Sequence, residues 1–164
     1  MRELEQILAG DGYAAPPSHI LEGLSQEVVH QLPPRAPHSI YEELWHITFW
    51  QQITLDWIAG VETPFPASPR DGFPTVLDAE REYWKDLCQR FFAGIAQAAA
   101  AARDERWLDL PVRCPSRPGN PVRVMTVREQ LENLAAHNAY HLGRIVLLRQ
   151  LLDAWPPASG GFTW

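Results

Sequence analysis

The chain has 164 residues, of which 46% are hydrophobic and 21% are charged, and its formal net charge is −6 at pH 7. This composition is typical of one globular domain rather than of a disordered chain, and no apolar run approaches the roughly 20 residues of a membrane span. The 14 basic residues are dispersed among 20 acidic ones, whereas nucleic acids require clustered positive charge. We therefore expect neither a nucleic-acid partner nor a membrane partner.

Two further features favour a cytoplasmic location. The N-terminal stretch "MRELEQILAG" lacks the basic start, apolar block and cleavage site of a secretory signal. Cys88 and Cys114 lie far apart and lack CxxC spacing, which is typical of reduced thiols rather than of a disulfide framework. We expect a cytoplasmic protein with a single domain over residues 1–164.

The first half of the chain predicts a short helix and two long ones. The short helix covers "RELEQILAG" and is closed by Gly10. The first long helix is expected over residues 17–32, where apolar residues recur every three or four positions, and "LPPRAP" ends it. The second begins at Ser39, where "SIYE" is a capping box, and ends at Gly60. The prolines of the following "TPFPASPRDGFP" favour an ordered, extended loop.

The second half predicts two more long helices and a small hairpin between them. The third long helix is expected over residues 75–102, and its alanine-rich end favours close approach to a neighbour. Two β-favouring pieces, 112–114 and 122–125, flank the turn signature "RPGN". The fourth helix covers residues 126–154 and starts with the capping box "TVRE".

Four long helices joined by loops indicate an all-α fold, a four-helix bundle with a small extra N-terminal helix and a short hairpin-like loop before the last helix. We expect its core over about residues 17–157 and a flexible tail over 158–164.

Three histidines stand at positions where the helical spacing is otherwise mostly apolar. His137 and His141 are four residues apart, so they project side by side on the fourth helix and can bind one metal ion. His46 belongs to a similar series on the second helix. Three imidazoles with open positions for water are typical of a catalytic metal site, because a structural zinc is usually closed by four ligands.

The same histidines allow other interpretations. Each of them can instead be a hydrogen-bonded core residue. The sequence has no HExxH. A di-iron bundle needs two Glu-x-x-His motifs, and although the second long helix has one, Glu43 to His46, the fourth has none. A mononuclear centre therefore fits better. His19, His30 and His38 lie near helix ends or the proline-rich turn, where surface or capping roles are expected.

The stretches "HSIYEELWHITFWQ" and "AAHNAYHLGRIVLLRQLLDAWPP" resemble the DinB-like (DinB/YfiT) superfamily of metalloenzymes, with the same order of elements over roughly residues 17–157. The resemblance implies an up-down-down-up bundle, frequent homodimers, and one divalent ion (nickel, zinc, iron or manganese) held by His46, His137 and His141. Characterised members of the superfamily include transferases and isomerases that use a low-molecular-weight thiol. Many members have Gln where this chain has Arg144.

The leading hypothesis is thus a metal-dependent thiol S-transferase or hydrolase acting on a small molecule. Glu42 and Glu43 are candidates for an acid–base group or for orienting a ligand, although Glu43 can also lie on a solvated helix face. Tyr140, toward the edge of the bundle, and Asn138, inside it, can polarise a substrate. The alternative is a non-catalytic, dimeric bundle that binds a metal or small ligand in a stress response.

Overall fold

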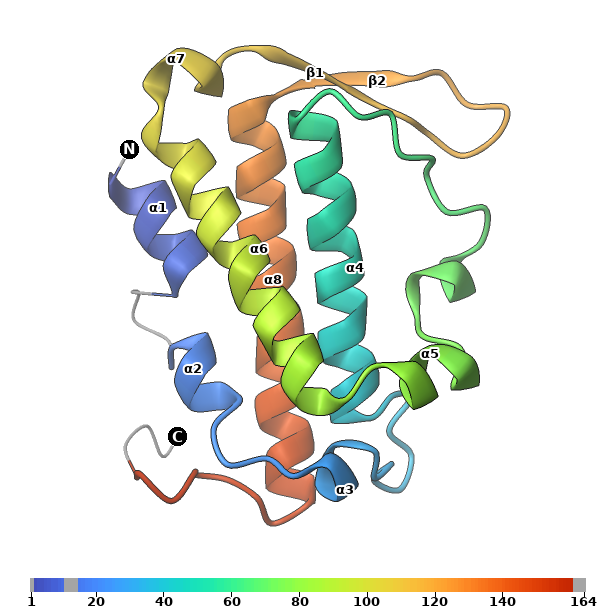
Figure 1. Ribbon diagram of the computed structural model, residues 1–164, viewed down its shortest axis with the longest axis vertical. Helices are drawn as coiled ribbons and strands as arrows, with labels where there is room; N and C mark the ends of the chain where they lie inside the picture. Colours follow the sequence, from blue (N-terminus) through green and yellow to red (C-terminus); the bar gives the residue numbers. More distant parts are fainter. Residues whose placement is uncertain (1, 11–14, 161–164) are drawn as a thin grey trace.

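A computed structural model describes residues 2–10 and 15–160 and shows a mainly helical molecule with one small two-stranded sheet. Its long helices are α4 (Ile40–Ile58), α6 (Trp84–Arg103) and α8 (Val127–Leu151). Figure 1 shows that α4 and α6 run in the same direction and that α8 runs in the opposite one. The prediction of a predominantly helical fold is confirmed.

Both predicted capping boxes are present at the starts of α4 and α8. Ser39 Oγ accepts from the Glu42 amide at 3.3 Å, and the Glu42 carboxylate accepts from the Ser39 amide at 2.7 Å. Thr126 and Glu129 make the same reciprocal pair. Each box satisfies two amides that the helix itself leaves without a partner, so the local sequence fixes where these two helices begin.

The predicted helix over residues 17–32 is wrong, because two short helices replace it. They are α2 (Pro17–Ile20) and α3 (Gln26–Val29). Gly23 has φ +70°, a left-handed conformation that ends a helix. Ser25 then accepts a hydrogen bond from the Val28 amide and starts α3.

The predicted helix over residues 75–102 is also interrupted. The structure has α5 (Val76–Arg81) and then α6, with Glu82 extended between them. Tyr41 donates its hydroxyl to the Glu82 carbonyl at 2.9 Å, and Arg90 donates twice to the Glu82 carboxylate at 2.8 Å. These hydrogen bonds satisfy the carbonyl and the carboxylate of Glu82 while its backbone is extended, so the chain can leave the helical conformation at this residue.

The remaining elements surround the long helices. They are α1 (Arg2–Ala9), a 3₁₀ turn (Pro69–Gly72), α7 (Glu105–Leu108), β1 (Pro111–Cys114) and β2 (Arg123–Thr126). The strands pair antiparallel with Val112 opposite Met125, which confirms the predicted hairpin. Figure 1 places this hairpin at the end of the bundle where α8 begins. In the described part of the chain, no helix is both long and apolar enough to cross a bilayer. Residues 161–164 of the expected tail lie outside the described residues.

The buried apolar side chains form two clusters with a polar layer between them. One cluster includes Ile40 and Leu44 of α4 with Ile145 of α8, and the other includes Ile53 of α4 with Leu131 of α8. Between the two clusters along α4 and α8 lie the buried polar residues Thr48, Gln51, Asn138 and His141, and the buried Glu43 pairs with His141 from α4. Buried polar groups are costly unless they have partners, and here Glu43 pairs with His141 while Asn138 donates to Gln51 between the two helices.

Candidate metal centre

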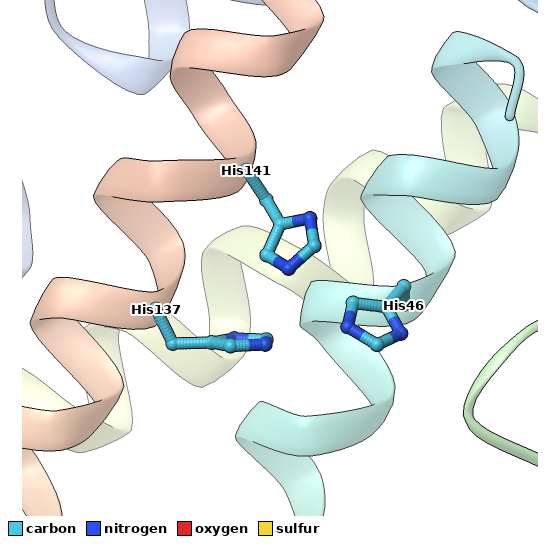
Figure 2. A group of neighbouring side chains, drawn as sticks. All are labelled: His46, His137 and His141. Atoms are coloured by element: carbon cyan, nitrogen blue, oxygen red, sulfur yellow. The ribbon is translucent and has the colours of Figure 1, made fainter. Parts of the chain in front are cut away.

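Three imidazole rings converge between α4 and α8. His137 and His141 project from consecutive turns of α8 toward His46 of α4 (Figure 2). The ring centroid of His141 is 4.5 Å from that of His46 and 4.5 Å from that of His137, and the third pair is 5.2 Å apart. One potential ligand atom from each residue lies within 4.8 Å of the other two. The tertiary structure thus brings together the three histidines that the sequence singled out.

The tautomer of His46 is set by the loop after α4. Its Nδ1 lies 2.7 Å from the carbonyl oxygen of Gly72. A carbonyl oxygen only accepts, so Nδ1 carries the hydrogen and, in the neutral ring, Nε2 keeps its lone pair. A Cβ on Gly72 would lie 3.2 Å from Trp50 Nε1 and 3.4 Å from His46 Nδ1, so a glycine allows this close approach. Phe73 stacks on the His46 ring with centroids 4.3 Å apart.

The tautomer of His141 is set by a buried carboxylate. Its Nδ1 lies 2.6 Å from Glu43 Oε2, and the other carboxylate oxygen pairs with Arg144 Nη2 at 2.8 Å. Glu43 is 0% exposed, so the expectation that it can lie on a solvated face is wrong. Carboxylates that accept the second N–H of a histidine are typical of metal sites, where they fix the ring and raise its basicity. The bond leaves Nε2 of His141 free for a metal ion.

His137 contributes a ring with an unsatisfied nitrogen. Its Nδ1 is buried and has no hydrogen-bond partner among the described residues. Burial, assisted by the neighbouring His141 and His46, lowers the pKa of His137 to about 4. Burial also lowers the pKa of His46, against the opposing effect of its bond to Gly72. Both rings are therefore neutral near pH 7, which is the form that binds metals.

The residues fit a divalent ion after a small adjustment. Two nitrogens that bind the same zinc ion, each about 2.1 Å from it, lie no more than about 4.2 Å apart. The potential ligand atoms of the three histidines lie within 4.8 Å of one another. Shifts of the rings by less than about 1 Å would therefore bring all three atoms to binding distance. Three imidazoles, two of them oriented by hydrogen bonds from the other ring nitrogen, are a donor set for zinc, nickel, iron or a similar ion.

The other candidate residues surround this cluster at different depths. Tyr140 is 64% exposed, and its ring lies 5.0 Å from that of His141. Asn138 is 6% exposed and donates to Gln51, which confirms that it lies inside the bundle. Glu42 is engaged in the cap of α4. Cys114 is buried in β1, where its sulfur accepts from Gln130 at 3.0 Å, and it lies outside the histidine cluster.

Several residues around the site were not identified from the sequence as contacts of the cluster. Gly72 and Phe73 belong to the proline-rich loop, which was predicted to be ordered but gave no sign of which carbonyl or ring reaches His46. His38 stacks on Phe73 with centroids 3.9 Å apart, although a surface or capping role was expected for it. Arg144 was noted only as a departure from the superfamily pattern, and its pairing with Glu43 depends on the packing of α4 against α8.

The fold and the site therefore define a class, that of mainly helical proteins in which two long helices bring three histidines close enough to hold a metal ion. The family model of the DinB superfamily matches residues 18–145, which is more than half of the chain, and the protein belongs to that superfamily. The resemblance inferred from the histidine motifs is thereby confirmed. No curated protein matches the chain.

Proposed function

We propose that the protein is an enzyme dependent on one divalent metal ion, which His46, His137 and His141 bind. The observation that carries the proposal is the pair of hydrogen bonds behind two of these rings. Gly72 and Glu43 hold the Nδ1 hydrogens of His46 and His141, so their Nε2 lone pairs are left for a ligand. A buried carboxylate paired with a histidine and an arginine is expensive to desolvate, and a bound cation would offset that cost.

The reaction that we propose is transfer of a low-molecular-weight thiol to a small molecule, or a hydrolysis. When bound, a divalent ion lowers the pKa of a coordinated water or thiol and so supplies a nucleophile near neutral pH. In this proposal Glu43 orients His141, and Gly72 orients His46. Tyr140 is exposed beside His141 and offers its hydroxyl to a substrate, and Arg144 lies 5.8 Å from the centroid of the Tyr140 ring, where its charge favours an anionic group.

We also propose the wider setting of this function. The protein would be a cytoplasmic homodimer of single-domain subunits, without a nucleic-acid or membrane partner, and its net charge of −6 supports the absence of a nucleic-acid partner. Together α1 and α2 would take the place of the first helix in an up-down-down-up bundle. In Figure 1 α1 lies beside α6, and α1 and α2 both contact α8, which supports this assignment.

Metal content is the direct test of the site. The protein is purified without added metal, then supplied in turn with zinc, nickel, iron and manganese, and measured by elemental analysis. We expect one ion per chain, lost in each of H46A, H137A and H141A. His30→Ala is the matched control, because His30 is exposed, its ring hydrogen-bonds to Gln26, and it lies outside the histidine cluster. A chain that takes up none of these ions, or keeps them in all three variants, contradicts the proposal.

Activity requires a second measurement. Conjugation of monobromobimane or chlorodinitrobenzene is followed with several cellular thiols, with and without the metal that binds best. Thiol conjugation that needs both the metal and His141 supports a transferase. Stoichiometric metal without any metal-dependent conjugation or hydrolysis supports the non-catalytic alternative, a metal-binding bundle.

A further inference from the structure

A cavity of about 660 Å³ lies among α1, α2, α6 and α8, and none of the three clustered histidines lines it. Its buried wall is aliphatic and includes Leu8, Ile20, Ile95 and Leu142, all less than 10% exposed. Ile7 and Leu147 also line it, and both are more than half exposed. A volume between about 300 and 1,000 Å³ is typical of small-molecule sites. The cavity therefore has the size and the apolar wall of a binding pocket.

The electrostatic character of the cavity limits what it can bind. Among the described residues that line it, none is Asp, Glu, Lys, Arg or His. A charged ligand would lose its hydration without gaining a countercharge, which costs several kcal/mol or more. The lining therefore favours an uncharged molecule with mostly apolar surface.

Two buried polar atoms of the lining have no hydrogen-bond partner among the described residues. Asn138 is 6% exposed, its Oδ1 accepts no hydrogen bond from the described residues, and its Nδ2 makes only a long bond of 3.4 Å to Gln51. Trp155 Nε1, on another lining residue, is likewise unpartnered among the residues described. Buried polar atoms in native proteins almost always have a partner.

We propose that this cavity binds an uncharged, largely apolar small molecule that carries a polar group able to hydrogen-bond with Asn138 or Trp155. The site is separate from the histidine cluster, and binding does not require a metal ion. Gly143 leaves room for a ligand on the α8 side, because a Cβ added there meets no heavy atom within 4 Å.

The test uses N-phenyl-1-naphthylamine, an uncharged apolar fluorophore with one N–H group, titrated into the full chain. We expect saturable binding at one site per chain with a rise in fluorescence. Gly143→Leu and Ala139→Leu place aliphatic groups in the lining and should weaken binding by roughly tenfold or more, equal to about 1.4 kcal/mol. Ala136→Leu is the matched control, because Ala136 is exposed on the same helix but does not line the cavity.

Two further measurements distinguish binding in this cavity from binding at the histidine cluster or on exposed apolar surface. The anionic probe 8-anilinonaphthalene-1-sulfonate should bind more weakly than the uncharged probe, and His46→Ala should keep the binding of the uncharged probe. Circular dichroism verifies that each variant is folded, and Ala139→Leu, at an exposed position, carries the test alone if Gly143→Leu does not fold. Absence of saturable binding, unchanged affinity in a folded cavity variant, or tighter binding of the sulfonate would overturn the proposal.

Discussion

Glu43→Gln tests whether the buried carboxylate prepares His141 for a metal ion. Glutamine keeps the size of the side chain and can still accept one hydrogen bond, but it removes the negative charge that lies 2.6 Å from His141 Nδ1 and 2.8 Å from Arg144 Nη2. Removing the partner behind a metal-binding histidine typically lowers metal affinity 10- to 100-fold, or about 1.4–2.7 kcal/mol. We expect a loss in that range.

The same substitution should also lower the free energy of unfolding of the metal-free protein. A hydrogen bond to a charged group contributes about 1.5–3 kcal/mol and a neutral one about 0.5–1.5, so we expect a loss of about 1–2 kcal/mol. Arg144 is 30% exposed and can regain water, which keeps the loss below the cost of breaking a fully buried ion pair.

The assay is a competitive zinc titration against a chromogenic chelator, paired with urea unfolding of the metal-free protein. Glu42→Gln is the matched control, because Glu42 precedes Glu43 on the same helix and, within the described residues, its carboxylate bonds to the Ser39 amide at the helix cap. It should leave zinc affinity unchanged. If folded Glu43→Gln binds zinc as tightly as the wild type, the carboxylate has no role in the site and the role assigned to it at His141 is refuted.

Three further predictions concern the rest of the molecule. Gly94→Ala should destabilise the protein by about 1–3 kcal/mol in urea unfolding, because the new Cβ would lie 1.9 Å from Gln51 Nε2. Gly143→Ala is the control, because a Cβ added there has no neighbouring atom within 4 Å, and it should stabilise its helix by about 0.5–1 kcal/mol. Equal effects would contradict the close packing of α4 and α6. Burial raises the pKa of Tyr41 from 10.0 to about 12, so the stability that the neutral hydroxyl contributes is complete below pH 10 and is lost as pH rises toward 12. Tyr41→Phe should therefore reduce the fall in the free energy of unfolding over this alkaline range. If the fall is unchanged in the variant, other groups cause it. Burial raises the pKa of Cys88 to about 12, so iodoacetamide at pH 8 should modify it roughly a thousandfold more slowly than a free thiol. Modification at the rate of glutathione would show that the thiol is not buried.

Local signals in the sequence were sufficient for the features that depend on a few consecutive residues. The capping boxes at Ser39 and Thr126 fixed the starts of α4 and α8 because both partners lie within four residues. The hairpin around "RPGN" followed from turn chemistry in the same way. By contrast, apolar periodicity continued through Gly23 and Glu82, where the chain leaves the helical conformation. Apolar periodicity indicates which face of a segment is buried. It does not indicate that one residue within the segment has a non-helical backbone conformation.

By itself the sequence determined that His137 and His141 share one helix face and that His46 stands in a similar position on another helix, since helical spacing alone places residues four apart side by side. Only the tertiary structure decided how those rings are held. The carbonyl of Gly72 reaches His46 from 26 residues away, and Glu43 reaches His141 from 98 residues away. A hydrogen bond between distant segments depends on the packing of whole elements, and no local pattern of residue types encodes its distance or direction.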